Sequence, residues 1–421
     1  MCLSFYKHHT RKIMKNSKSY KQLEKYNQLH VLKYLNDINE EEKECLINQL
    51  NSIDFSILDN YAAKNIIMKR GNIEPIDVVS VDEIEQNKEA YFNTGVDILK
   101  KGKIGAVLLA GGQGTRLGFD KPKGVLNVGI TRELYLFEIL INNLFEQVKI
   151  ADRWIHLAIM TSIKNDNETK AFFEKHDYFG YNKEYITFFV QEMAPAVDFD
   201  GKIFLEDKHK IALSPNGNGG WFTSLKTTGI LNKLKEEGVE WLNIFSVDNV
   251  MQKIADPCFM GAIIRNKCIS GAKVVRKVSP EEKVGVLCLE DGKPSIIEYY
   301  EMTKDMLYDK DKNGNYKYNY GVILNYLFNI EAIEQSISDS MPVHMVERKI
   351  NYMNSEGKTV KPEKPNGYKF ETLVLDMIHR LDNCLGYEVI RNKEFAPIKN
   401  KDGIDSPGSA RRIMKENGIE L

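Results

Sequence analysis

The chain has 421 residues, enough for roughly two to four structural units and a large buried core. Its 58 Lys and Arg residues nearly balance its 59 Asp and Glu residues, and a formal net charge of −1 argues against a dedicated binder of nucleic acid or anionic membranes. With 43% hydrophobic and 28% charged residues, the composition is typical of an ordered globular protein and excludes disorder along most of the chain.

The cysteines and apolar segments exclude several further classes. None of the six cysteines forms a CxxC pair, so structural zinc and thioredoxin-type redox chemistry are not supported. No apolar run approaches the ~20 residues that a membrane helix needs, and no apolar stretch follows the basic start of the chain as in a secretory signal. We therefore expect a cytoplasmic protein with reduced thiols and no membrane partner.

The first part of the chain is basic and then helical. Residues 1–36 carry seven Lys and one Arg against one Glu, which is typical of a solvated leader, with a nucleic-acid or lipid contact as the alternative. From about Lys21 to Asp59 apolar residues recur with helical spacing, and acidic residues at 40–42 favour the start of a second helix. We expect a helical N-terminal section over 1–95.

The middle of the chain alternates between short apolar runs and helical stripes. The runs that predict buried strands are 103–110, 156–161, 186–192 and 241–247. The segments with helical spacing are 131–148 with Thr131 as N-cap, 165–177, and 221–237, which Gly238 would end. This alternation predicts an α/β fold with a mostly parallel sheet covered by helices.

From about 272 to 330 the pattern changes to closely spaced strands. The predicted strands are 273–278, 284–290 and 295–300, with Asp291-Gly292 as a hairpin-like turn, and 318–328 continues the domain. We expect an antiparallel insertion here. Apolar residues at 370, 373 and 377 indicate a further helix. The expected organisation is an α/β domain over 96–400 followed by a short tail over 401–421.

The most informative segment is a glycine-rich turn directly after the first predicted buried strand. It reads LLAGGQGTRLG over 108–118 and is followed by KPKG over 121–124. Closely spaced glycines let the backbone approach a ligand and turn its N–H groups toward an anion. Arg116 and Lys123 add two cations and Thr115 adds a hydroxyl, a combination that suits a polyphosphate.

Two common phosphate loops do not match this turn. A Walker A loop needs Gly-Lys followed by Ser or Thr, whereas Lys123 stands between Pro122 and Gly124. The dinucleotide fingerprint GxGxxG also fails, because Leu117 occupies the position of its last glycine. The segment therefore indicates a phosphate site of a different class.

GGQGTRLG followed by PKG resembles the signature of nucleotide-sugar pyrophosphorylases, and from about Tyr20 to Ile413 the chain resembles the eukaryotic-type UDP-N-acetylglucosamine pyrophosphorylase family. The segments that carry this resemblance are VQEMAPA at 190–196, SPNGNGGW at 214–221, FSVDN at 245–249, IEYYE at 297–301, YNYG at 318–321 and FAPIKN at 395–400. The resemblance implies a Rossmann-like, mostly parallel central sheet and Mg²⁺ as cofactor. Family members usually continue into a small β-rich C-terminal domain, which this sequence lacks, so we expect a monomer.

The resemblance also implies roles for individual residues. The nucleotide would contact Leu109, Ala110, Gly111, Gly112, Gly114, Thr115, Gln191 and Gly217. The sugar would contact Asn218, Gly219, Gly285, Glu298, Asn319 and Phe370. Arg116, Lys123 and Lys399 would act on the phosphates, and Asp248 would hold Mg²⁺.

The implied reaction joins UTP and N-acetylglucosamine 1-phosphate into UDP-N-acetylglucosamine and pyrophosphate, reversibly, by in-line attack on the α-phosphorus. Catalysis would rest on positioning and charge neutralisation, because the sugar phosphate is already ionised at neutral pH. One alternative is a UDP-glucose or broad-specificity UDP-sugar pyrophosphorylase, and another is a non-catalytic UDP-sugar-binding protein. N-acetylglucosamine and N-acetylgalactosamine are not separated by the sequence, and no nucleic-acid partner is expected.

Overall fold

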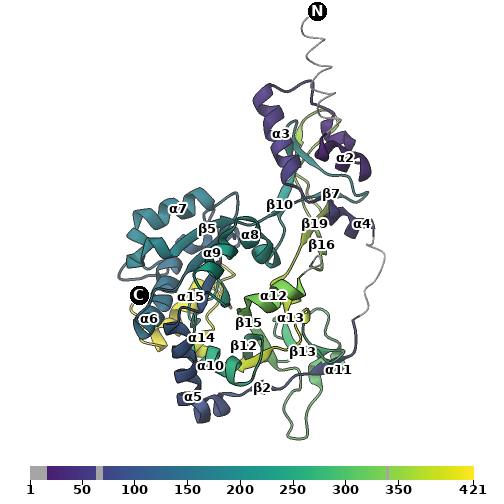
Figure 1. Cartoon of the computed structure of the whole chain (residues 1–421). Coiled ribbons are helices and arrows are strands. Elements are labelled where there is room, and N and C mark those ends of the chain that lie inside the picture. Colours follow the sequence, from purple (N-terminus) through teal and green to yellow (C-terminus); the bar gives the residue numbers. More distant parts are fainter. Residues whose placement is uncertain (1–16, 63–69, 338–340) are drawn as a thin grey trace, which may run out of the picture. The chain divides into compact units, whose positions relative to one another are not determined.

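The computed structural model describes residues 17–62, 70–337 and 341–421 (Figure 1). Residues 1–16 of the predicted basic leader lie outside the described residues. The chain forms two compact units from interleaved segments. The smaller unit comprises 1–69, 192–220 and 342–373, and the larger unit comprises 70–191, 221–341 and 374–421.

The larger unit is built on a mixed sheet with eleven strands among the described residues. The main path runs β2 (Val78–Val79), β20 (Leu385–Glu388), β12 (Ser270–Arg276), β15 (Tyr320–Asn329), β11 (Trp241–Ser246), β3 (Ile104–Leu109), β4 (Leu157–Thr161) and β5 (Ile186–Val190). Off this path, β13 (Val286–Glu290) pairs with β15, β14 (Lys293–Ile297) and β1 (Ile73–Pro75).

Strand directions divide this sheet into two parallel parts joined by one antiparallel strand. β11, β3, β4 and β5 pair in parallel, and so do β12, β20 and β2. Strand β15 runs antiparallel to both β11 and β12. The prediction of an α/β architecture with a mostly parallel central sheet and antiparallel strands near 272–330 is confirmed.

Helices cover both faces of the sheet, and β3 shows this most clearly because its alternate residues point to opposite sides. Ile104, Ala106 and Leu108 pack into the core shared with α5 (Val81–Lys100), α6 (Leu136–Ala151), α7 (Asp166–Lys175) and α10 (Pro257–Arg265). Val107 and Leu109 pack into the core shared with α8 (Trp221–Thr227), α9 (Ile230–Glu236), α12 (Ile330–Ser336) and α13 (Val374–His379). This burial explains the continuous apolar run in the sequence.

Helices α5 and α10 cross at two glycines. A Cβ atom added to Gly95 would lie 1.9 Å from the carbonyl oxygen of Pro257, and one added to Gly261 would lie 1.8 Å from that of Tyr91. Only glycine lets two backbones approach so closely. The crossing fixes the start of α10, where the Asp256 side chain accepts a hydrogen bond from the Cys258 backbone N–H at 3.0 Å as a helix cap.

A separate apolar cluster joins the glycine turn to the last helices. Leu117 of the turn packs with Val250, Ile398 and Met414 in this cluster. The later helices of the larger unit are α11 (Lys304–Tyr308), α14 (Arg391–Glu394) and α15 (Pro407–Glu416). Across the described parts of the chain, every helix is too short or too polar to cross a bilayer.

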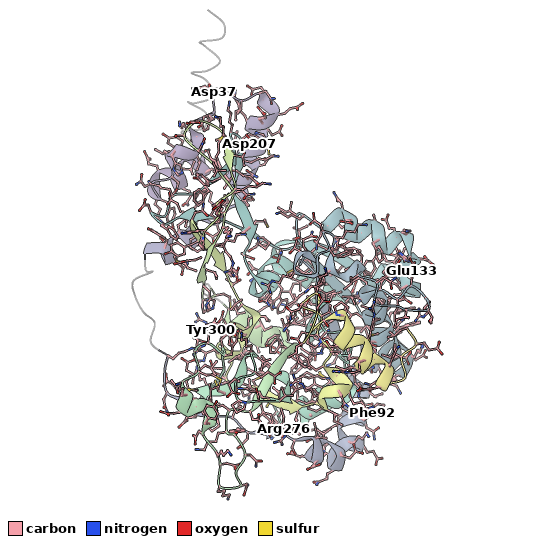
Figure 2. All side chains as sticks on the ribbon, turned by 180° about the vertical axis from the view of Figure 1, so that it is seen from behind. Asp37, Phe92, Glu133, Asp207, Arg276 and Tyr300 are labelled. Atoms are coloured by element: carbon pink, nitrogen blue, oxygen red, sulfur yellow. The ribbon has the colours of Figure 1, made fainter. Side chains whose placement is uncertain are left out.

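The smaller unit combines short helices with short antiparallel strands around its own core. Its helices are α2 (Lys18–Lys25), α3 (Glu40–Ser52) and α4 (Asp59–Ala62). Its strands are β6 (Met193–Pro195), β7 (Val197–Asp198), β8 (Leu205–Asp207), β9 (Lys210–Ile211), β10 (Leu213–Pro215), β16 (His344–Arg348), β17 (Tyr352–Met353), β18 (Thr359–Val360) and β19 (Gly367–Glu371). Leu46, Leu50 and Phe370 are among its buried core residues. Asp37 and Asp207 lie on this unit, and Glu133 and Arg276 on the larger one (Figure 2).

Most of the predicted elements form close to their predicted positions. The four predicted buried strands correspond to β3, β4, β5 and β11. Asp291 and Gly292 have φ of 51° and 79° and join Glu290 to its partner Lys293, which confirms the hairpin turn. The acidic start of the second helix is also confirmed, because α3 begins at Glu40 with a capping box on Asn39.

The predicted helix start at Thr131 is wrong. Helix α6 begins at Leu136, and Thr131 instead donates its backbone N–H to the Leu421 carbonyl at 2.8 Å. The reason is a local antiparallel pairing of Asn127 with Tyr135, which holds the segment before the helix in an extended turn.

Two other helix predictions also need correction. The segment 221–237 forms two helices rather than one, because Gly229 adopts a left-handed conformation with φ of 78° between α8 and α9. Phe370 is not helical: it lies in β19 opposite Met345, and α13 begins only at Val374. Sequence spacing missed this change because one apolar residue in a strand can by chance continue a helical stripe.

Candidate active site

The glycine turn lies at the carboxyl end of β3, where open α/β sheets place their ligands. It begins where the Ala110 backbone N–H donates to the Met160 carbonyl at 2.8 Å, and it is closed by hydrogen bonds from Lys123 N to Gly112 O at 3.2 Å and from Gly114 N to Lys121 O at 3.0 Å. A Cβ added to Gly112 would meet nothing within 4 Å. The backbone at Gly112 is therefore open to a ligand.

Asn165 fixes the start of this turn, and we did not single it out from the sequence. Its side-chain amide donates to the Ala110 carbonyl at 2.9 Å, and its carbonyl oxygen accepts from the Ser162 backbone N–H at 2.7 Å. The residue is completely buried. The one signal in the sequence was its position shortly after a predicted strand. That signal is weak, because a polar residue at such a position is as often a helix cap.

Gln191 packs directly against the turn. A Cβ added to Gly111 would lie 2.6 Å from the Gln191 side-chain nitrogen, so only glycine leaves room for this amide. The Gln191 backbone N–H donates to Thr161 O at 2.9 Å at the end of β4, and the residue is buried. The structure therefore brings the predicted nucleotide residues Gly111, Gly112 and Gln191 together, and Leu109 and Ala110 join them as the end of β3 and the start of the turn.

Lys123 and Asp248 form an ion pair at this edge. Strand β11 runs parallel to β3 with Ser246 opposite Leu109, so the segments after the two strands meet. The Lys123 ammonium donates to the Asp248 carboxylate at 2.7 Å, and the two side chains are 13% and 27% exposed. A partly exposed pair of opposite charges can open to admit an anion and a cation of a substrate complex.

The segment that carries Lys399 is held against the same edge. The Ile398 backbone N–H donates to Asp248 O at 2.8 Å. The Asn249 side chain donates to Glu394 O at 2.7 Å and accepts from Ala396 N at 2.9 Å, which pins this segment to the end of β11. Lys399 follows this segment directly, so it lies at the same edge as Lys123 and Asp248. The third predicted phosphate residue, Arg116, lies on the glycine turn itself. Arg116 and Thr115 are both exposed there, on a short 3₁₀ helix (Thr115–Leu117).

Asp405 closes the turn that follows Lys399. The backbone N–H groups of Lys399 and Asn400 both donate to the Asp405 carbonyl, at 2.7 and 2.9 Å. Burial raises the pKa of the Asp405 carboxyl, and the Lys399 charge opposes that rise. The Lys399 ammonium therefore lies in the electrostatic reach of a half-buried acid.

The predicted sugar residues divide between the two units. In the larger unit, a Cβ added to Gly285 would lie 3.7 Å from Glu298 Cδ, so these two residues are neighbours. Asn319 directly precedes β15, and its backbone carbonyl accepts a hydrogen bond from Lys277 N at 2.9 Å.

The smaller unit carries Gly217, Asn218, Gly219 and Phe370. Gly217 has φ of 90°, and a Cβ there would lie 2.2 Å from the Thr372 carbonyl oxygen. Gly219 N donates to the same carbonyl at 2.9 Å. These glycines allow the 216–220 loop to run against the strand end at 372, whereas the Phe370 side chain is completely buried in the core of the unit.

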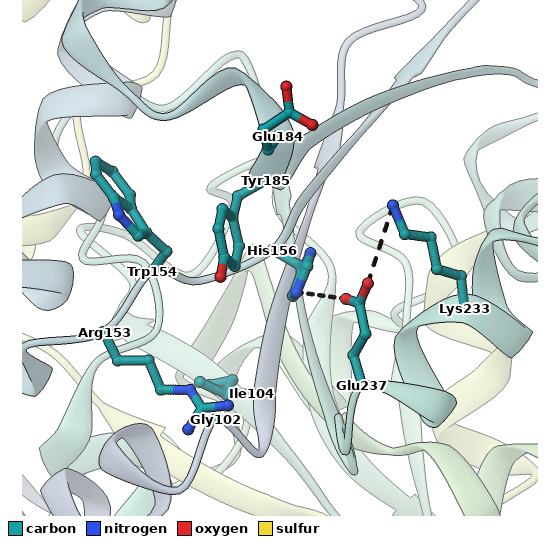
Figure 3. Close-up of a pocket in the computed structure, with 9 residues that line it drawn as sticks. All are labelled: Gly102, Ile104, Arg153, Trp154, His156, Glu184, Tyr185, Lys233 and Glu237. Atoms are coloured by element: carbon teal, nitrogen blue, oxygen red, sulfur yellow. Dashed lines mark ion pairs between the residues drawn. The ribbon is translucent and has the colours of Figure 1, made fainter.

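A cavity of about 450 Å³ lies at the opposite edge of the sheet (Figure 3). Its lining residues Ile104, His156 and Tyr185 stand at the amino ends of β3, β4 and β5, away from the glycine turn. His156 Nε2 lies 2.5 Å from Glu237, whose other oxygen is 4.0 Å from the Lys233 ammonium. Burial lowers the pKa of His156 more than Glu237 raises it. This cavity is therefore not part of the candidate active site.

Comparison with known proteins identifies the family. The family described as UTP--glucose-1-phosphate uridylyltransferase matches residues 55–405. The chain belongs to this family. The match to this uridylyltransferase family spans the glycine turn, the Lys123–Asp248 pair and Lys399.

Individual relatives are similar over most of the chain. The chain is 32% identical to "UDP-N-acetylhexosamine pyrophosphorylase-like protein 1" of Mus musculus, covering 93% of this chain and 82% of the relative. It is 35% identical to the UDP-N-acetylglucosamine pyrophosphorylase of Saccharomyces cerevisiae, covering 86% and 78%. The crystal structure of the uridine diphosphate N-acetylglucosamine pyrophosphorylase of Trypanosoma brucei in complex with inhibitor has a TM-score of 0.80 at 28% identity, covering 94% and 83%. The similarity to UDP-N-acetylglucosamine pyrophosphorylases expected from the motifs is confirmed.

Proposed function

We propose that this uridylyltransferase makes UDP-N-acetylglucosamine and pyrophosphate from UTP and N-acetylglucosamine 1-phosphate, reversibly. The observation that carries the proposal is the Lys123–Asp248 pair beneath an open glycine turn, at the carboxyl ends of two adjacent parallel strands. The names of the yeast and trypanosome relatives support this sugar. The alternation of parallel strands with covering helices also supports the Rossmann-like arrangement that we expected.

In the proposed reaction, an oxygen of the sugar phosphate attacks the α-phosphorus of UTP. The bond from that phosphorus to the bridging oxygen breaks, and pyrophosphate leaves with the electron pair. The nucleophile is already an anion at neutral pH, so the chain needs to position and neutralise charges rather than to remove a proton. Backbone N–H groups of the turn and Arg116 would hold the leaving pyrophosphate, and Lys123 and Lys399 would bring the two anions together.

The neighbouring residues suit the two ends of the nucleotide sugar. Gln191 offers both a donor and an acceptor beside Gly111, as the edge of a uracil ring requires. Glu298 offers two acceptor oxygens beside Gly285 for sugar hydroxyls. The family resemblance is the basis for assigning Gly217 to the nucleotide, and for assigning Asn218 and Gly219 to the sugar.

The residues at this edge fit a magnesium ion that is held partly by the substrate. Within residues 17–62, 70–337 and 341–421, no three His, Cys, Asp or Glu side chains gather as a metal cage. Mg²⁺ needs no such cage, because one or two carboxylates plus substrate phosphates usually hold it. Asp248 is the carboxylate in place, and the ion, when bound, neutralises charge on phosphate oxygens.

Replacing Asp248 by Asn is expected to raise the Mg²⁺ concentration that gives half-maximal activity and to lower the maximal rate. The amide is a weaker ligand for a hard cation, and it removes the negative partner of Lys123. A Mg²⁺ titration of pyrophosphate release measures both effects. Asp402→Asn removes an exposed carboxylate as the matched control. A titration curve for the Asp248 variant that overlays the wild type would remove Asp248 from the metal site.

A panel of sugar phosphates tests the proposed function. Pyrophosphate release from UTP should be faster with N-acetylglucosamine 1-phosphate than with glucose 1-phosphate, and N-acetylgalactosamine 1-phosphate is included because the sequence does not separate the two acetylated sugars. A preference for glucose 1-phosphate would favour the UDP-glucose alternative, to which the description of the family points. Binding of UDP-sugar without turnover of any member of the panel would favour the non-catalytic alternative.

A further inference from the structure

The last glycine of the turn has a lysine from far along the chain beside it. Gly118 has φ of 72°, and apart from its chain neighbours the only described heavy atom within 4 Å of a Cβ built there is Lys401 Cδ, at 3.9 Å. The Cδ atom of Lys401 therefore lies beside the last glycine of the turn. The sequence places these residues 283 positions apart, so nothing in it linked them.

Lys401 sits on a turn that is closed by its own hydrogen bonds. The Asn400 side chain donates to Ile404 O at 2.9 Å, and the Ser406 hydroxyl donates to Gly403 O at 2.7 Å. Together with the two backbone bonds to Asp405 and the bond from Ile398 to Asp248, these contacts anchor both ends of the 399–405 turn. An anchored turn holds its side chains in place at little further cost in conformational entropy.

The charges at this place favour an anion. Lys401 and Arg116 are both exposed, and neither forms an ion pair with any residue that the structure describes. Arg116 lies two positions before Gly118, in the 3₁₀ helix (Thr115–Leu117) that Gly118 caps. Asp120 and Asp402 are exposed acids of the same two segments, but neither pairs with Lys401 or Arg116 in the described chain. Two unpaired cations at the glycine turn suit a polyphosphate.

We propose that Lys401 binds the β- and γ-phosphates of UTP together with Arg116, and so contacts the pyrophosphate that leaves. This inference rests on the proposed function and extends it with a phosphate contact from the 399–405 turn. Lys401 stays protonated throughout: the electron pair of the broken P–O bond goes to pyrophosphate, and no proton moves. Its role is to stabilise charge on the leaving group.

The reverse reaction separates this role from a general effect of surface charge. In Lys401→Met, the KM for pyrophosphate is expected to rise about tenfold, because one charge-assisted contact is lost, while the KM for UDP-N-acetylglucosamine changes little. Lys401→Arg should restore most of the affinity for pyrophosphate. Lys415→Met, which removes an exposed lysine of α15, is the matched control.

Each outcome of this experiment decides a definite point. An unchanged KM for pyrophosphate in Lys401→Met, with a wild type that turns over, overturns the role of Lys401 and leaves the proposed function intact. An equal rise in the KM of both substrates also overturns it, because a distorted site would affect both. A wild-type protein that turns over no nucleotide sugar overturns the proposed function and this inference with it.

Discussion

Replacing Lys123 by Ala is expected to lower turnover about 10²–10³-fold, the usual effect of removing one donor to charge that develops in the transition state. Lys123 is 13% exposed and reaches the end of the neighbouring strand, where its ammonium lies 2.7 Å from Asp248. The loss should fall mainly on kcat, because the backbone of the glycine turn would keep its proposed contacts to the phosphates. Pyrophosphate release at saturating UTP and N-acetylglucosamine 1-phosphate measures it.

This substitution should leave folding nearly unaffected, so a change in rate can be attributed to the loss of the Lys123 side chain. Asp248 is 27% exposed, so water can solvate its carboxylate once the lysine is gone, and partly exposed pairs contribute about 0–1 kcal/mol to stability. Lys121→Ala is the matched control, since Lys121 is exposed and forms no ion pair among the described residues. A Lys123 variant that keeps a rate within about threefold of the wild type would remove this lysine from the mechanism.

Most strands of the sheet could be predicted from the sequence, because their patterns are local, but β1, β2 and β20 were not predicted. Ile104 to Leu109 is apolar at every position since helices cover both faces, and Asp291-Gly292 is a turn by its own backbone preferences. The predictions of local structure were wrong where contacts with distant parts of the chain determine that structure. Thr131 looks like a helix cap, but it binds the Leu421 carbonyl 290 positions away.

The sequence predicted those residues of the candidate site that lie in or beside the glycine turn. Family resemblance assigned Lys123, Asp248 and Lys399, and the parallel pairing of β3 and β11 explains why the first two meet. The residues that support them were missed, because a buried amide such as Asn165 or Asn249 has no distinctive local pattern. Their roles depend on which carbonyl and N–H groups the fold brings within reach.

The buried ion triad around Lys273 is the strongest example of such support. The Lys273 side chain is completely buried, and its ammonium lies 2.8 Å from Asp256 and 2.6 Å from Glu394. Asp256 caps α10, and Glu394 ends α14, four residues before Ile398. The triad therefore links β12 to both segments that frame Asp248.

Two opposing effects set the protonation of Asp256 and Lys273. Burial alone would raise the pKa of Asp256, but the Lys273 charge outweighs it and holds that pKa below its usual range. Burial alone would lower the pKa of Lys273, but the two carboxylates raise it. An acid whose pKa is lowered by folding stabilises the protein at pH values above its unfolded pKa, which is about 4. A lysine whose pKa is raised by folding stabilises the protein at pH values below its unfolded pKa, which is about 10.4. The Asp256–Lys273 pair is therefore charged and stabilising through the neutral range.

Replacing Lys273 by Met is expected to destabilise the larger unit by about 3–5 kcal/mol, because it leaves two buried carboxylates without their shared cation. Thermal unfolding should shift down by on the order of 10 °C at pH 7.5. Lys293→Met is the matched control. Lys293 also lies in a strand and faces an acid, Asp382 at 4.0 Å, but its side chain is 57% exposed. Its replacement should therefore lower the free energy of unfolding by less than about 1 kcal/mol.

The pH dependence of the Lys273 variant separates loss of charge from loss of packing. Without the ammonium, burial dominates and raises the pKa of Asp256 above its unfolded value. A group with a raised folded pKa is less destabilising as pH falls, since protonation removes its buried charge. The gap in unfolding temperature between wild type and Lys273→Met should therefore narrow from pH 7.5 to pH 5. A gap that stays constant over this range would mean that the lost methylene packing, and not the unpaired carboxylates, causes the destabilisation, because packing does not titrate.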